Sequence, residues 1–284
     1  MSLGAVFLAL GIGILLGVAI GENGVVSNAS KDLENSLRGD LNNARSRNAE
    51  QRRQLSVHDD YERQTYEPLV RDLLPGWRVG IVAMGKLAGG YSSRVADAVE
   101  PAGATVDSVS VIKAPLPAGR LASDMDGTRL ARLDRSNDQM ERFGRRIGRQ
   151  IVNGGDLVQR LRHDLFSSSR GQYRGLDGIV YVRDRDGLDG DTKQAQDAFE
   201  TGLLTALSDS GAGLSGVETT GTDPSQLGFV SSQGIATVDD INLTAGRTAL
   251  VWVFAGGGTG KYGVKGTADH LLPKPPEQTA SRGP

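Results

Sequence analysis

The stretch Trp77-Arg-Val-Gly-Ile-Val-Ala-Met-Gly85 decides the fold of this chain. It is a short apolar run, rich in β-branched side chains, and it follows the helix-breaking pair Pro75-Gly76. A run of this kind is typical of a strand that is buried on both faces of a parallel sheet. We therefore predict a buried strand over residues 77–85, at the start of an α/β domain.

The residues after this strand predict a βαβ unit. Tyr91 to Val99 has the apolar spacing of an amphipathic helix, which Pro101 and Gly103 end, and Thr105 to Ile112 alternates as a second strand. Strand, helix and strand in this order form a parallel unit, which is right-handed as a rule. The sheet is therefore predicted to be mostly parallel.

Further segments continue the alternation towards the C-terminus. We predict helical structure over residues 128–165, interrupted near residue 154, and a helix over residues 191–208. The remaining predicted strands cover residues 178–182, 217–220 and 248–254. This order predicts a Rossmann-like, three-layer α/β domain over residues 75–272, with helices on both faces of the sheet. The tail, residues 273–284, is rich in Pro and polar residues and is predicted to be disordered.

An uncharged apolar segment, Leu3 to Ile20, lies at the other end of the chain. As a helix it would span roughly 27 Å, close to the hydrocarbon thickness of a bilayer. A cleaved signal peptide is the alternative, but no Lys or Arg precedes the apolar run, and Val18-Ala-Ile-Gly21 is a poor cleavage site. We predict a single-pass transmembrane anchor over residues 1–22.

Small residues recur every four positions in this anchor, at Ala5, Ala9, Gly13, Gly17 and Gly21. On a helix they form one stripe, and the last three make a tandem GxxxG pattern. Close approach of backbones is a main source of helix association in lipid, so these residues predict a helix-pairing face. The alternative is that glycine is simply frequent, since it makes up 39 of the 284 residues.

Residues 23–74 predict a long helical stalk. Its seam follows alternating spacings of four and three residues, at Leu37, Leu41, Ala44, Asn48, Gln51 and Leu55. This spacing is typical of a parallel coiled coil, in which Asn48 would fix the register at some cost in stability. A single solvated helix is the alternative. Because a paired anchor leads directly into a paired stalk, we predict a dimer or higher oligomer.

The composition excludes several classes of function. There are 32 Lys and Arg against 34 Asp and Glu, a net charge of -2, which excludes a globally basic nucleic-acid-binding protein. The chain has no cysteine, which excludes disulfides, thiolate metal sites and cysteine catalysis. His58, His163 and His270 lie in separate segments, and the four methionines have no M-x-x-M spacing. The residues therefore define no copper ligand set.

Two strings resemble catalytic motifs without fulfilling them. Asp124-Met-Asp-Gly-Thr128 matches the signature of phosphatases that form an aspartyl phosphate, but a loop-like segment, residues 115–123, precedes it in place of a strand. Ala255-Gly-Gly-Gly-Thr-Gly-Lys261 resembles a Walker A loop, but Tyr262 stands where the Ser or Thr that binds Mg²⁺ belongs. Both are interpreted as turns, and we predict no enzyme activity and no cofactor.

A ligand site in this fold is expected where parallel strands end, because ligands of open α/β sheets dock at the carboxyl ends of the strands. This places candidate loops at residues 85–90 and 184–191. The second loop is acidic and rich in glycine, a composition that binds hard cations. It fails the EF-hand spacing, because Leu188 occupies the third ligand position.

The order of these segments resembles the actinobacterial copper transport protein B (MctB) family. The resemblance lies in residues 7–17, the stalk, the strand from Arg78, and the later strings at residues 236–240, 245–250 and 261–264, and it covers about Ser2 to Pro273. It implies a non-enzymatic envelope protein with one span and an extracytoplasmic domain. It also implies copper as the transported ion, through efflux or an outer-membrane channel.

Similarity to SteB-like envelope proteins implies the alternative function. In that case the chain is a scaffold that binds a partner membrane protein during cell-wall or septum assembly. The expected partners are a second copy of the chain and membrane lipid, and for the scaffold also a membrane protein of the envelope. The expected location is the cytoplasmic membrane or a mycobacterial-type outer membrane.

Overall fold

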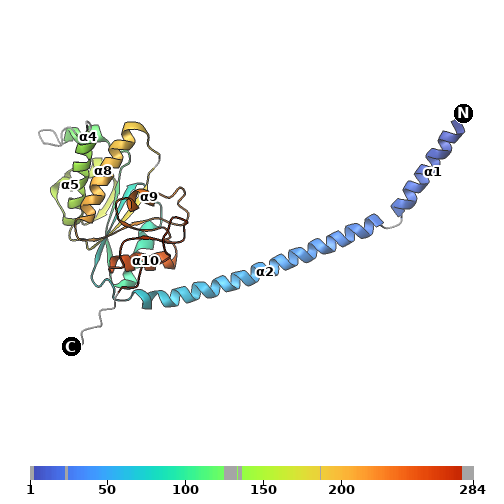
Figure 1. Cartoon of the computed structure of the whole chain (residues 1–284), viewed down its shortest axis with the longest axis horizontal. Coiled ribbons are helices and arrows are strands. Elements are labelled where there is room, and N and C mark those ends of the chain that lie inside the picture. Colours follow the sequence, from blue (N-terminus) through green and yellow to red (C-terminus); the bar gives the residue numbers. More distant parts are fainter. Residues whose placement is uncertain (1–2, 23–24, 125–132, 134–135, 186, 277–284) are drawn as a thin grey trace. The chain divides into compact units, whose positions relative to one another are not determined.

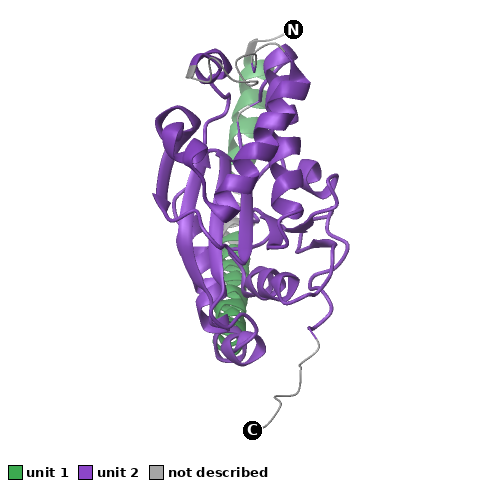
Figure 2. Ribbon diagram, turned by 90° about the vertical axis from the view of Figure 1, so that its left-hand side faces the viewer, with its two compact units in different colours: residues 1–61 green, residues 62–284 purple. Residues whose placement is uncertain are grey.

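The structure is a computed structural model of the whole chain, and it describes residues 3–22, 25–124, 133, 136–185 and 187–276 (Figure 1). The chain divides into two compact units, residues 1–61 and residues 62–284 (Figure 2). The first unit consists of the helix α1 and most of α2. The second holds the end of α2 and all the strands.

α1 spans Leu3–Glu22 and contains the predicted pairing stripe. Ala5 and Ala9 are exposed, and no other part of the chain lies within 4 Å of where a Cβ would stand at Gly13 or Gly17. The surroundings of Gly21 lie outside the described residues. The pairing face thus stays a prediction.

Among the residues whose side chains are described, no helix is both long and apolar enough to cross a membrane.

α2 spans Val25–Val70, so the predicted stalk is one continuous helix that ends four residues earlier than expected. All six predicted seam residues are exposed, and the exposed fractions of Leu37, Leu41 and Leu55 are 58%, 50% and 61%. Ion pairs within the helix, such as Arg38 with Glu34 at 2.6 Å, lie at the surface. The coiled coil itself requires a second chain and stays a prediction.

The second unit contains a seven-stranded sheet with the order β3-β2-β1-β4-β5-β6-β7. All neighbouring strands pair in parallel except β2 and β3, so the predicted mostly parallel sheet is confirmed. β1, the strand that the sequence predicted first, lies inside the sheet between β2 and β4 and is buried on both faces. The strands are β1 (Arg78–Gly85), β2 (Thr105–Ile112), β3 (Phe166–Gly171), β4 (Gly178–Asp184), β5 (Gly213–Val217), β6 (Ala236–Val238) and β7 (Lys261–Tyr262).

Helices cover both faces of this sheet (Figure 1). Val82 and Met84 of β1 pack towards α5 and α8, whereas Ile81 and Ala83 pack towards α3 and α10, as the alternation of side chains along a strand requires. The helices are α3 (Tyr91–Val99), the 3₁₀ turn η1 (Glu100–Ala102), α4 (Ala118–Asp124), α5 (Asn137–Asn153), α6 (Asp156–Arg160), α7 (Arg162–Leu165), α8 (Gly190–Ser208), α9 (Leu227–Ser231) and α10 (Thr244–Phe254).

Glycines let α5 and α8 approach each other closely. A Cβ at Gly144 of α5 would overlap the carbonyl oxygen of Phe199, and a Cβ at Gly202 of α8 would overlap the carbonyl oxygen of Glu141. The two backbones therefore touch where these glycines lie. Because the overlapping atoms belong to backbone, no side-chain rotation can relieve them.

The end of α2 belongs to the core of the second unit. Tyr66, Val70 and Leu74 are buried in the same cluster as Val95 of α3. The Tyr66 hydroxyl donates to the carbonyl oxygen of Ala98 at 2.7 Å, and burial is the main cause that raises the pKa of Tyr66 above its usual range. The last turns of α2 are thus fixed by packing within the chain.

Several predicted elements were wrong in type or position. Residues 248–254 lie in α10 instead of forming a strand, because a short apolar run looks the same in a buried helix and a buried strand. The predicted strand at 217–220 is β5, which ends at Val217. The loop-like segment before Asp124 contains α4. The predicted helical stretch at 128–165 is divided into α5, α6 and α7, and residues 128–132 and 134–135 lie outside the described part.

Candidate functional site

Buried charge is concentrated at the carboxyl ends of β4, β5 and β6. Among the described residues, the buried charged residues are Arg185, Glu200, Glu218, Asp239 and Asp240. Each strand is followed immediately by one of them: Arg185 after β4, Glu218 after β5 and Asp239 after β6. Glu200 of α8 faces the end of β4. Ligands of open α/β sheets dock at this edge, so the buried charges mark the candidate site.

The first group of charges surrounds Glu200. Arg183 donates from Nε to Glu200 Oε2 at 2.7 Å, and the Tyr181 hydroxyl donates to the same oxygen at 3.0 Å. Arg185 forms an ion pair with the other oxygen, with 3.1 Å between Nε and Oε1. Burial raises the pKa of Glu200 above its usual value, against the lowering effect of the two arginines. Burial likewise raises the pKa of Tyr181.

A second carboxylate, Asp197, joins three cations. Its Oδ1 accepts from Arg183 Nη2 at 3.2 Å and from Arg185 Nη2, and its Oδ2 accepts from Lys193 Nζ at 2.5 Å. Arg183 also donates to Gln226 at 3.1 Å. Three positive charges thus face two carboxylates. Among the described residues, Arg185 Nη1 has no hydrogen-bond partner.

A cavity of about 460 Å³ lies beside this group. Arg183, Asp184 and Arg185 line it from β4 and the following turn, Lys193 lines it from α8, and the loop at residues 222–226 lines it after β5. The predicted loop at 184–191 is therefore part of a cavity. The other predicted loop, residues 85–90, lies next to it, since the Lys86 amide donates to the Asp184 carbonyl oxygen at 2.7 Å.

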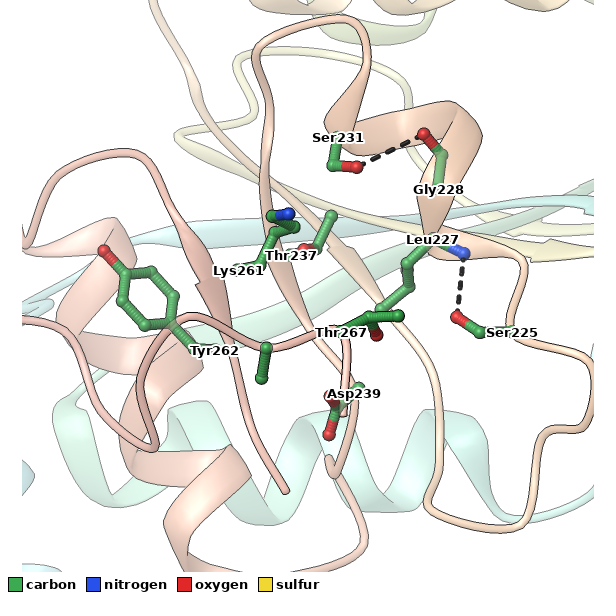
Figure 3. Close-up of a pocket in the computed structure, with 10 residues that line it drawn as sticks. Ser225, Leu227, Gly228, Ser231, Thr237, Asp239, Lys261, Tyr262 and Thr267 are labelled. Carbon is green, nitrogen blue, oxygen red and sulfur yellow. Dashed lines mark hydrogen bonds between the residues drawn. The ribbon is translucent and has the colours of Figure 1, made fainter. Parts of the chain in front are cut away.

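A smaller cavity of about 200 Å³ lies on the other side of the same loop, between α9 and β7 (Figure 3). Ser225, Thr237 and Lys261 are among its lining residues. The dashed lines in Figure 3 show that Ser231 donates to the Gly228 carbonyl oxygen and that Ser225 accepts from the Leu227 amide. These hydroxyl groups are thus used by the local backbone.

Asp239 and Glu218 hold the segment that follows β7. Asp239 accepts from the amides of Val264 at 2.8 Å and Lys265 at 3.1 Å, and Glu218 accepts from Lys265 Nζ at 2.6 Å. Lys265 Nζ also donates to the Thr222 carbonyl oxygen at 2.6 Å. These contacts hold the segment after β7 against the carboxyl ends of β5 and β6.

Asp240 differs from its neighbours because it has no such partners. It is completely buried, and neither carboxylate oxygen has a hydrogen-bond partner in the described part of the chain. A Cβ at Gly246, in the first turn of α10, would collide with Asp240, so only glycine fits there. Burial, followed by the charge of Asp239, raises the pKa of Asp240 to about 6.

The sequence profile of a family described as "Copper transport outer membrane protein, MctB" matches residues 1–273. The chain belongs to the MctB family. The match includes α1, α2 and the whole sheet, so the resemblance drawn from the sequence is confirmed. A search among curated proteins finds no match to the chain. MctB is a family of transport-related envelope proteins and is not a known enzyme family.

The described residues of this MctB chain contain no cluster of three or more His, Cys, Asp or Glu that could hold a metal ion. His58, His163 and His270 are exposed and lie on separate elements. Met84 and Met140 are buried, and the Met84 sulfur accepts from Gln196 Nε2 at 3.0 Å. Met1 and Met125 lie outside the described residues.

The two motif-like strings fall in different surroundings. Asp124 is the last residue of α4, and residues 125–128 lie outside the described part. Lys261 begins the short strand β7, whereas the lysine of a Walker A loop opens a helix.

Sequence reasoning missed the charge cluster around Glu200. Its members come from one strand and one helix, and no short motif connects them. Two signals were present in the sequence. Arg183 and Arg185 directly follow a buried apolar run, and Glu200 stands beside Phe199 on the inward side of the predicted helix. Charged residues in such positions indicate pairing across elements.

Proposed function

We propose that this chain is a membrane-anchored, non-enzymatic component of copper transport in the cell envelope, acting in efflux or as part of a channel. The observation that carries the proposal is the MctB family match over residues 1–273. Copper is then the cargo of the assembly, since the described residues offer no resident ligand set for it. The second unit supplies a folded domain outside the cytoplasm.

Anchoring rests on the apolar segment from Leu3 to Ile20, which carries no charged residue and lies within α1. A helix satisfies its own backbone hydrogen bonds and is therefore the form in which one segment can enter lipid. One apolar helix encloses no pore, so passage of copper requires several copies or a partner. The proposal therefore includes self-association.

Self-association rests on the exposed leucines of α2. Leu33, Leu37, Leu41 and Leu55 are each at least half exposed. Full burial of one such side chain contributes about 1.5–3 kcal/mol, so a second parallel copy would gain from covering them. The stripe of small residues in α1 would bring the two anchors together in the same direction.

A deletion strain tests the proposed function. We expect loss of the gene to raise cellular copper and copper sensitivity while septation stays normal. The intact chain should restore the copper content, whereas a chain without residues 1–22, secreted by a cleavable signal, should not. Unchanged copper content in the deletion strain would contradict the proposal.

The alternative is a scaffold that binds a partner membrane protein during cell-wall or septum assembly. The exposed seam of α2 favours it equally, because a protein that works by assembly needs interaction surfaces and no copper ligands. In this case the deletion strain shows altered septation at normal copper content. Protease treatment of intact cells should, under either function, cut the second unit first.

A further inference from the structure

The cavity at the ends of β4 and β5 has the features of a binding site that the copper function does not use. We infer that it binds a small phosphorylated ligand that also carries hydroxyl groups, such as a sugar phosphate. Its volume of about 460 Å³ lies in the range of small-molecule sites. The inference is independent of copper and of the anchor.

The first argument is that several cationic side chains line the cavity. Arg183, Arg185 and Lys193 line the cavity, and their only carboxylate partners in the cluster are Asp197 and Glu200. Three cations thus face two carboxylates in this inner cluster, while Asp184 and Asp223 line the cavity with two further carboxylates. Arginine pairs are well suited to phosphate, because the planar guanidinium group donates two parallel hydrogen bonds.

Unused donors are the second argument. The Arg185 side chain is only 6% exposed, yet its Nη1 has no hydrogen-bond partner among the described residues. A buried donor without a partner is costly, so its presence beside a cavity indicates a group that binds there. The Lys193 ammonium group has three N–H donors, and one of them forms the hydrogen bond to Asp197.

The position of α8 is the third argument. This 19-residue helix begins at Gly190, beside the cavity, and its N-cap Asp189 makes no side-chain hydrogen bond to the first turn. The amides of the first turn have no partner within the helix, and the helix dipole favours an anion at this end. Lys193, in the first turn of α8, lines the cavity, so the dipole at this helix end adds to the attraction of an anion.

The acidic residues of the same cavity specify the rest of the ligand. Asp184 and Asp223 line it together with Thr222. A bare anion would be repelled by these two carboxylates, whereas hydroxyl groups of a sugar can donate to them. The ligand therefore combines one phosphate, held by Arg183, Arg185 and Lys193, with hydroxyl groups on the side of the loop at 222–226.

Calorimetric titration of the full chain in detergent tests this inference, with ribose 5-phosphate, inorganic phosphate and ribose as probes. We expect ribose 5-phosphate to bind more tightly than inorganic phosphate, and ribose not to bind. Lys193→Gln should weaken ribose 5-phosphate roughly tenfold, since it removes one charge-assisted hydrogen bond. Lys193 is 55% exposed, so the variant should fold, and its thermal unfolding checks this.

Two further variants make the test more specific: a matched control, and a variant that should change the affinities for the two phosphates in opposite directions. Arg142→Gln removes an exposed cation that is also paired with an Asp four residues away, on α5, and should leave binding unchanged. Asp223→Ala should weaken ribose 5-phosphate and strengthen inorganic phosphate. Failure of both phosphates to bind at millimolar concentrations, or equal binding to the wild type and Lys193→Gln, would overturn the inference.

Discussion

Two stretches of the same helix α2 have opposite surroundings. Leu37, Leu41 and Leu55 expose half or more of their surface, whereas Tyr66 and Val70 are buried in the core of the second unit. A helix gains most of its stability from packing its apolar side, so the second stretch is stabilised within the chain. The first stretch has apolar residues at heptad spacing that no described part of the chain buries. The difference shows that one end of α2 is packed in the folded unit, and it leaves the other end available for the proposed association.

Glycines also differ between packed and uncovered positions, and substitution of a packed glycine gives the largest expected effect. Gly202→Val places side-chain atoms where the Glu141 carbonyl lies and should lower the free energy of unfolding of the second unit by about 3 kcal/mol or more. Gly39→Ala is the control. Nothing lies within 4 Å of Gly39, and alanine should stabilise α2 by up to about 1 kcal/mol. Thermal and denaturant unfolding of both variants measures this, and equal effects would contradict it.

Two leucine substitutions give the next largest effect, one just beyond the buried end of α2 and one in its exposed stretch. Leu74→Ala, at a completely buried residue, should destabilise the second unit by about 2–4 kcal/mol. Leu37→Ala should change the unfolding of that unit by less than about 0.5 kcal/mol. It should instead lower the oligomeric fraction measured by analytical ultracentrifugation. A loss of stability from Leu37→Ala without loss of the oligomer would reverse the assignment of the two stretches.

Buried charge in the second unit should make its stability depend on pH. The pKa of Asp240 is raised from 3.8 to about 6, so the folded state holds a proton that the unfolded state releases. The stabilisation that this proton provides is present below pH 3.8 and is lost as the pH rises to about 6. Asp240→Asn removes the charge and should raise stability above pH 6 by roughly 3 kcal/mol, with little effect near pH 3.5. Unfolding curves in which both proteins show the same pH dependence would disprove this.

Charges in the first unit should matter least. Arg53 pairs with Glu50 at 2.5 Å on the exposed surface of α2, and exposed pairs of this kind contribute about 0.3–0.5 kcal/mol. Arg53→Gln should therefore change the helix content of α2 only slightly, as followed by circular dichroism, and salt should remove the difference. A change above about 1 kcal/mol would mean that Arg53 has a partner beyond its own helix.

The sequence predicted the parts of the fold in which local pattern and burial agree. The run at 77–85 is mostly apolar and forms β1, an interior strand of the sheet, and the spacing from Tyr91 to Val99 predicted α3 with its true bounds. The sequence pattern gave a wrong prediction where the same composition fits a buried helix and a buried strand, as for the apolar run from Thr248 in α10. It also failed for β5 to β7, because strands of two to five residues carry too little periodicity.

The sequence predicted where the candidate site lies, but not which side chains interact there. The rule that ligands dock at the ends of parallel strands pointed to residues 184–191, and Asp184, Arg185, Gly187 and Leu188 of this segment line the larger cavity. The charges of the site are arranged by ion pairs such as that of Arg183 with Glu200, and tertiary packing brings these residues together. No spacing along the chain encodes which donor atom lacks a hydrogen-bond partner, and only the fold shows that Arg185 Nη1 has none among the described residues.

Crosslinking in native membranes tests most directly whether α2 pairs along its predicted seam. The chain has no cysteine, so a single introduced cysteine reports one position. Leu41→Cys, on the seam, should form a disulfide-linked dimer under mild oxidation, because equivalent seam residues of a parallel pair face each other. Asn43→Cys, on the outer side of the same turn, should not. Dimers from neither variant, or equally from both, would contradict the account.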